Sequence, residues 1–186
     1  FSPVMLFSCI MIKLTSPGPL IYRQTRVGLH NKPFEMYKFR SMAVQTEEKE
    51  KKAWTVKNDP RVTGFGKFMR HTSIDELPQL FNILKGDMSL VGPRPERPEL
   101  ARVITKNIPE FEYRLKVKAG LTGYAQVHGR YCTTSYDKLK LDLTYIRNYS
   151  IWLDLKLILI TPKVLLMKES TDGFEEGLWE DPALKE

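Results

Sequence analysis

Apolar and polar residues alternate in two stretches near the N-terminus, LIYRQTRVG at 20–28 and PFEMYKFRSM at 33–42. Alternation among β-branched and aromatic residues is typical of strands. The four residues LHNK between the stretches suit a hairpin loop. We therefore predict a β-hairpin whose second strand carries positions 34, 36, 38 and 40 on one face. This places Lys38 and Arg40 on the same side.

A helical period replaces the alternation further along. Leu77, Leu80, Phe81 and Leu84 recur at the spacing of an apolar helix stripe. Further helices are predicted at 64–72 with Phe65, Phe68 and Met69 inward, at 96–118 with a break near Pro109, and at 135–147. A loop with a short strand is expected at 119–131. The chain is thus predicted to be α+β and mostly helical.

Two starts are possible for the helix that contains Leu77. Ser73 and Glu76 match a capping box, but that start places Pro78 where its missing N–H removes a hydrogen bond. If Asp75 is the cap, Pro78 falls in the first turn, where no donor is lost. We favour the second start. In both cases Asp75 and Glu76 lie at the positive end of the helix dipole.

Two segments are strongly apolar, residues 1–14 and residues 151–168. The first is shorter than the roughly 20 residues that a spanning helix needs, and three lysines interrupt the second. Either segment could be a buried core helix. A re-entrant or interfacial membrane segment suits residues 1–14 better, and a helix lying in the membrane interface with its lysines at the headgroups suits residues 151–168 better. The break at Ser2-Pro3 fits a bent membrane helix.

Charge is unevenly distributed along the 186 residues. Residues 1–168 contain 28 Lys and Arg against 15 Asp and Glu, whereas residues 169–186 contain 1 against 7. A basic body with an acidic tail indicates an anionic partner, whether a nucleic acid, a membrane surface or a phosphorylated substrate. Cys9 and Cys132 lie in unlike contexts, so a disulfide framework is not expected. No Cys and His spacing suits zinc.

The candidate chemistry lies in the segment SIDELPQLFNILKGDMSLVGPRP at 73–95. Of Asp75 and Glu76, one could attack a substrate while the other holds Mg²⁺, although helix capping is the commoner use of such a pair. Arg94 stands between Pro93 and Pro95, which restrict its backbone and suit it to bidentate phosphate binding. Alternatively, this element is a surface turn with a solvated arginine.

Five motifs together resemble the bacterial sugar transferase family, the monotopic phosphoglycosyl transferases. They are FSPV, YKFRSM, the 73–95 segment, GLTGYAQVHGR and LDLTYIRNYSIWLDLKL, in this order from residue 1 to about 168. The resemblance implies a catalytic domain at 1–168, with 1–14 as the second half of a re-entrant helix and 169–186 as a tail. It also implies transfer of a sugar-1-phosphate from a UDP-sugar to undecaprenyl phosphate, with release of UMP, at the cytoplasmic face of the bacterial inner membrane.

The resemblance also implies roles for single residues. Asp75 would be the nucleophile that forms a covalent phosphosugar intermediate, and Glu76 would help to hold Mg²⁺. Substrate phosphates would contact the Pro93-Arg94-Pro95 element and basic residues, namely Arg70, Arg130 and one of Lys38 and Arg40. Ser2 and Pro3 would bend the membrane helix.

A different class of function also fits the charge, namely a non-enzymatic basic module that binds anionic lipid or nucleic acid. Such a module gives no reason for Asp75, Glu76 and Arg94 to occur together. Since the acceptor that the resemblance implies is a lipid, we expect membrane lipid rather than nucleic acid as the macromolecular partner. The sugar is open at this point, as is the oligomeric state, a homo-oligomer included.

Overall fold

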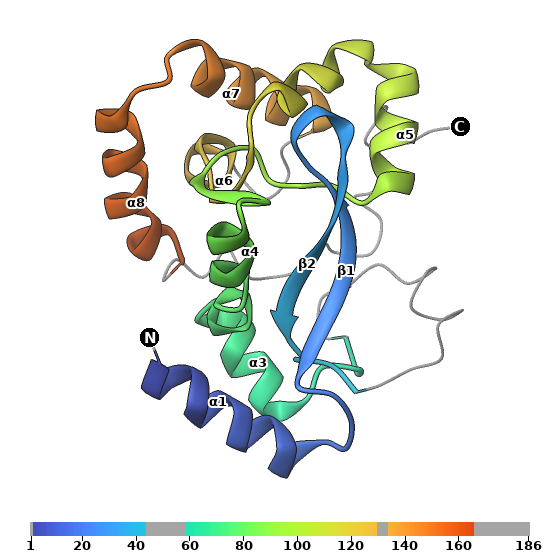
Figure 1. The fold of residues 1–186 in the computed structure, drawn as a ribbon, viewed down its shortest axis with the longest axis vertical. Coiled ribbons are helices and arrows are strands. Elements are labelled where there is room, and N and C mark those ends of the chain that lie inside the picture. Colours follow the sequence, from blue (N-terminus) through green and yellow to red (C-terminus); the bar gives the residue numbers. More distant parts are fainter. Residues whose placement is uncertain (1, 44–58, 130–133, 166–186) are drawn as a thin grey trace.

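The computed structural model of the chain describes residues 2–43, 59–129 and 134–165, and Figure 1 shows their arrangement. The acidic tail expected at 169–186 lies outside these ranges. The elements in chain order are α1 (Ser2–Thr15), β1 (Ile21–Val27), the 3₁₀ turn η1 (Leu29–Asn31), β2 (Pro33–Phe39), α3 (Gly64–His71), the 3₁₀ turn η2 (Ile74–Glu76), α4 (Gln79–Lys85), β3 (Met88–Val91), α5 (Pro98–Asn107), the 3₁₀ segment η3 (Pro109–Lys116), β4 (Ala119–Thr122), α6 (Tyr124–His128), α7 (Ser135–Arg147) and α8 (Ile151–Leu165).

The predicted hairpin is confirmed. Strands β1 and β2 pair antiparallel, with Ile21 opposite Phe39 at the open end and Val27 opposite Pro33 at the turn. The hairpin runs alongside α3 and α4, with α1 near its open end and α5 near its tip (Figure 1). The mostly helical α+β fold and the break between α5 and η3 at Pro109 also match expectation.

A second, parallel sheet was not predicted. Strand β3 pairs with β4, and the crossover between them contains α5 and η3. The two strands' ends come so close that a Cβ added to Gly120 would lie 2.1 Å from the backbone nitrogen of Gly92. Only glycine allows this approach. The crossover starts with Pro93, so this sheet fixes where the Pro93-Arg94-Pro95 segment begins.

Three small apolar clusters replace one continuous core. They are built around Ile12, Phe39 and Met69, around Val91, Tyr145 and Leu157, and around Ile104, Phe111 and Leu139. Each cluster joins elements that are distant in sequence. The first joins α1 and α3 to the hairpin, the second joins α7 and α8 to β3, and the third joins α5, η3 and α7.

Helix α4 differs from expectation in its start and in its orientation. Ser73, with φ 53°, precedes the separate 3₁₀ turn η2, so Asp75 is not a helix cap, and α4 begins only after Pro78. The C-terminal end of the apolar stripe faces outward, since Phe81 is 52% exposed and Leu84 83%, whereas Leu77 packs against the cluster around Ile12, Phe39 and Met69. The polar side of the helix faces the hairpin instead. Phe68 of α3, which was expected inward, is 51% exposed.

Asn82 explains why the polar side of α4 turns inward. This fully buried side chain donates to the Glu35 carbonyl at 2.7 Å and accepts from the Tyr37 N–H at 3.0 Å. Both backbone groups belong to the free edge of β2. A buried backbone polar group without a partner costs as much as a lost hydrogen bond, so a polar helix face suits this edge better than an apolar one.

Helices α1 and α8 are only partly buried. Helix α1 buries Ser8 and Ile12, and α8 buries Leu157. The large side chains that they expose are Val4, Leu6, Phe7, Ile10, Leu14, Ile151, Trp152, Leu155 and Leu159. Neither is therefore a buried core helix. None of the helices in the described part of the chain combines the length and apolar character needed to cross a membrane.

We expect Asn82→Ala to lower the free energy of unfolding by about 2–3 kcal/mol, because it leaves two buried backbone groups of β2 unpaired. Chemical denaturation monitored by circular dichroism measures this. Asn148→Ala, at an exposed helix end, is the matched control and should cost less than about 1 kcal/mol. Equal effects of the two substitutions would contradict the role given to Asn82.

Candidate active site

Two carboxylates are presented by the short turn η2 between α3 and α4. The left-handed conformation of Ser73 redirects the chain after α3, and η2 then closes with hydrogen bonds from the backbone nitrogens of Glu76 and Leu77. Consecutive side chains of a 3₁₀ turn point about 120° apart. The side chains of Asp75 and Glu76 therefore point in different directions, although the residues are adjacent in the chain.

Glu76 binds two cations from distant segments. Its Oε1 accepts a hydrogen bond from Lys38 Nζ of β2 at 2.6 Å and one from Arg94 Nη2 at 3.2 Å. Burial opposes ionisation of Glu76, but Lys38 and then Arg94 outweigh it and lower its pKa to about 2. The charge on Glu76 therefore stabilises the fold above about pH 4.5, and this contribution is lost as the pH falls towards 2.

Asp75 is in the opposite electrostatic situation. It is 8% exposed, and burial raises the pKa of its carboxyl to about 6. The charge of Glu76 adds to the rise, while Lys38, Arg70 and Arg94 oppose it. No hydrogen bond to this carboxylate comes from any residue within 2–43, 59–129 or 134–165. Asp75 thus faces three cations while its oxygens remain available for a ligand or for reaction.

The other basic residues expected here lie in different places. Arg70, in the last turn of α3, donates from Nε to Ser41 Oγ at 2.9 Å and is close enough to Asp75 to lower its pKa. Arg40 instead donates to the carbonyls of Ser16 and Pro17. It lies past the end of β2, where strand alternation no longer holds, so Lys38 and Arg40 do not share one site. Arg130 is outside the described residues.

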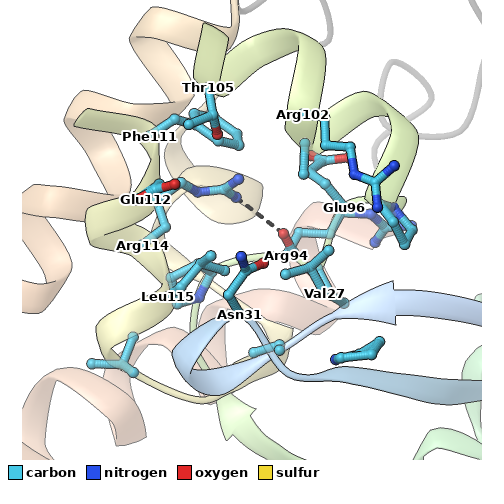
Figure 2. Close-up of a pocket in the computed structure, with 18 of the residues that line it drawn as sticks. Val27, Asn31, Arg94, Glu96, Arg102, Thr105, Phe111, Glu112, Arg114 and Leu115 are labelled. Atoms are coloured by element: carbon cyan, nitrogen blue, oxygen red, sulfur yellow. Dashed lines mark hydrogen bonds between the residues drawn. The ribbon is translucent and has the colours of Figure 1, made fainter. Parts of the chain in front are cut away.

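A cavity of about 420 Å³ adjoins the Pro93-Arg94-Pro95 segment. Its walls come from the hairpin tip, the 93–98 segment, α5 and η3, and Figure 2 shows its lining. The lining mixes apolar and charged side chains, including Val27, Glu96, Arg102, Thr105, Phe111 and Glu112. A second hollow of about 10 Å³ lies between Glu76 and Arg94. Arg94 borders both spaces, so it connects the carboxylate pair with the larger cavity.

Two arginines near Arg94 were not predicted, the half-buried Arg26 and the buried Arg114. Arg26 of β1 borders the smaller hollow, and Arg114 of η3 lines the larger cavity. Strand alternation and helix periodicity give no signal for either residue, because the contacts of both are made with segments distant in the sequence. Gln79, at the start of α4, is a buried polar residue beside Glu76 and Arg94.

The donor set limits which metal the site could hold. Among the residues that the structure describes, no three or more His, Cys, Asp or Glu side chains lie together so that they could hold a metal ion. Mg²⁺ needs only one or two protein carboxylates, because water and substrate phosphates complete its shell. Oε1 of Glu76 binds the two cations and leaves Oε2 for a ligand, so Glu76 fits a magnesium ion held jointly with a substrate.

Comparison with known proteins identifies the fold family. The family model described as bacterial sugar transferase matches residues 1–168. The chain belongs to the bacterial sugar transferase family. All the site residues named above lie within the matched part.

Curated members of the bacterial sugar transferase family are similar over most of this chain. A UDP-N-acetylgalactosamine-undecaprenyl-phosphate N-acetylgalactosaminephosphotransferase of Aeromonas hydrophila is 45% identical over 89% of the chain and 40% of its own length. A UDP-glucose:undecaprenyl-phosphate glucose-1-phosphate transferase of Escherichia coli (strain K12) is 46% identical over 86% and 35%. The uncharacterized sugar transferase EpsL of Bacillus subtilis (strain 168) is 41% identical over 90% and 80%. The chain therefore spans well under half the length of the first two relatives.

The raised pKa of Asp75 predicts a pH-dependent effect of Asp75→Asn on stability. An acid whose pKa rises on folding contributes stability below its unfolded pKa of 3.8, and this stability is lost as the pH rises through about 6. Without divalent ions, Asp75→Asn should raise the free energy of unfolding by about 3 kcal/mol at pH 8 and change it little at pH 4.

Denaturant titrations at the two pH values measure this difference. Asp137→Asn, at an exposed position of α7, is the control and should show no such pH dependence. A difference for Asp75→Asn that stays constant from pH 4 to 8 would contradict the burial of an ionisable Asp75.

Proposed function

We propose that this chain transfers a sugar-1-phosphate from a UDP-sugar to undecaprenyl phosphate and releases UMP. Its relatives at 45% and 46% identity carry names for this reaction with two different sugars, so the proposal extends to a UDP-sugar as a class. The observation that carries it is the pair of adjacent carboxylates with opposite pKa shifts, facing cations from three segments. Such a divergence suits two acids for different tasks.

In the proposed mechanism, Asp75 is the nucleophile. One of its carboxylate oxygens attacks the β-phosphorus of the UDP-sugar, and the bond from that phosphorus to the bridging oxygen breaks, so UMP leaves. The sugar phosphate is then held on Asp75 as an acyl phosphate. A phosphate oxygen of undecaprenyl phosphate attacks the same phosphorus, and Asp75 is regenerated as a carboxylate. Two steps replace one direct transfer between anions.

Cations would offset the repulsion between this nucleophile and its anionic substrates. Arg94 and Lys38 already face the carboxylates, and the second nitrogen of the Arg94 guanidinium suits a phosphate. Arg70 adds positive charge beside Asp75. A magnesium ion held by Glu76 and the diphosphate would supply further neutralisation of the leaving phosphate. Glu76, kept ionised by its two partners, is suited to that role at neutral pH.

The acceptor is a lipid, so the site must work at a membrane surface. Exposed apolar side chains of α1, α4 and α8 supply a surface for this, and basic residues favour an anionic leaflet by about 1 kcal/mol each. We infer that α1 contributes the second half of a re-entrant helix bent at Ser2 and Pro3. The water-soluble UDP-sugar and the basic body favour the cytoplasmic face of the inner membrane.

We expect Asp75→Asn and Asp75→Ala to lower the rate of UMP release about a thousandfold or more, because either change removes the nucleophile. Mass spectrometry after incubation with a UDP-sugar should detect the phosphosugar adduct on the wild-type protein only. The exposed Asp137→Asn serves as the control and should retain full activity. A deamidation-free Asp75→Asn protein with normal turnover would overturn the nucleophile assignment.

Removal of divalent ions should abolish transfer, and added Mg²⁺ should restore it. Because substrate phosphates complete the ion's shell, Mg²⁺ binding to the protein alone should be much weaker than in the presence of UDP. Glu76→Gln should raise the Mg²⁺ concentration needed for half-maximal activity, whereas Asp137→Asn should not. Full activity in excess chelator would rule out the proposed ion.

A further inference from the structure

The segment that carries Arg94 is fixed through four consecutive backbone carbonyls, those of residues 93–96. Each accepts one hydrogen bond from a different residue outside the segment. The donors, in the order of the carbonyls, are Gly120 N, Arg114 Nη2, Arg26 Nη1 and Val27 N, each at 3.0 Å. Two of these donors belong to backbone. The other two are side chains of buried or half-buried arginines.

These bonds restrict the dihedral angles that proline leaves free. The proline ring fixes φ at 93 and 95 but not ψ, and the direction of a carbonyl follows ψ. Binding each carbonyl to a partner therefore fixes the remaining freedom of the segment. The direction in which Arg94 leaves the backbone, towards Glu76, is then set by residues that bind the segment's carbonyl groups.

Arg114 is itself held rigidly. Its side chain is 5% exposed, its Nε donates to Asp142 Oδ2 at 2.6 Å, and its guanidinium lies 4.4 Å from the centre of the Phe111 ring. Figure 2 shows the hydrogen bond from Arg114 to the Arg94 carbonyl at the edge of the cavity. Because Asp142 is 1% exposed on α7, the pair connects a buried helix position to the Arg94 backbone.

Arg26 holds the next carbonyl in a similar way. Its Nε and Nη2 both donate to Gln24 Oε1, while Nη1 reaches the Pro95 carbonyl. Burial and the nearby charge of Arg94 lower the pKa of Arg26 to about 10, which shows that its position is electrostatically unfavourable.

We propose that Arg26 and Arg114 are positioning residues that hold the backbone at 94 and 95 so that the Arg94 guanidinium stays between Glu76 and the cavity. The inference rests on the proposed function, in which Arg94 binds the phosphates of the donor. It gives two further residues a role that is exerted through Arg94, although Arg26 also borders the smaller hollow and Arg114 the larger cavity.

Double-mutant cycles with Arg94 test this inference. Arg114→Lys and Arg26→Lys retain the positive charge, but a single amine on its stem cannot bridge the two acceptors that each guanidinium bonds. Each is combined with Arg94→Ala, and kcat/KM for UMP release is measured for the single and double variants. The dissociation constant of UDP, from calorimetry, is a second readout that does not depend on turnover. Arg23→Lys, at an exposed position on β1, is the matched control.

We expect Arg114→Lys and Arg26→Lys each to lower kcat/KM and UDP affinity about tenfold with Arg94 present, and less than twofold in the Arg94→Ala background. Each lysine substitution should lower the free energy of unfolding by the same amount with Arg94 and with Arg94→Ala, since the contacts that it breaks do not involve the Arg94 side chain. Arg23→Lys should have no effect in either. If one lysine variant does not fold, the other cycle still decides.

If Arg114→Lys and Arg26→Lys lower UDP affinity equally with Arg94 and with Arg94→Ala, the inference is overturned and the proposed function is left intact. An Arg94→Ala protein that binds UDP and turns over normally would also overturn it. If no sugar-1-phosphate transfer is detected, but the lysine substitutions weaken UDP binding only when Arg94 is present, the proposed reaction fails and the positioning role stands. If no UDP binds at all, both fail.

Discussion

The bond of the Glu76 carboxylate to Lys38 and Arg94 is the interaction on which the site depends. It joins a hairpin strand, a 3₁₀ turn and the segment after β3. The two cations keep Glu76 ionised, and the negative charge of Glu76 in turn offsets the repulsion between Lys38 and Arg94. The adjacent Asp75 receives no such contact, and its burial raises its pKa instead. One turn thereby holds two carboxyl groups in opposite electrostatic states, which is how neighbouring acids come to serve different functions.

The surrounding structure keeps these groups in place through backbone contacts. Asn82 fixes α4 to the edge of β2, which also carries Lys38. The close approach of Gly92 and Gly120 fixes the start of the segment with Arg94. Since α4 turns its polar side to the hairpin, its apolar side is exposed, as are the apolar sides of α1 and α8. The packing that supports the carboxylates thus also creates the apolar surface that a lipid acceptor would require.

Local rules predicted the elements that local physics controls. Alternation located the hairpin, Pro109 marked the break between α5 and η3, and periodicity placed α7 at residues 135–147. Strand β3 was missed because its four residues gain their strand character only from pairing with β4, about thirty residues later. The start and orientation of α4 were wrong because hydrogen-bonding groups on β2 outweighed the apolar stripe. Periodicity shows that a helix has two faces, not which one meets a polar surface.

Among the site residues, the sequence determined the adjacent acids, the arginine between prolines and the family to which the chain belongs. It did not determine which cation meets which acid. The tertiary structure brought Lys38 to Glu76, directed Arg40 to the turn after α1 and placed Arg26 and Arg114 beneath the Arg94 segment. Contacts between residues tens of positions apart depend on how the whole chain closes. Burial, which separates the pKa values of Asp75 and Glu76, is likewise a property of the closed chain and not of the motif.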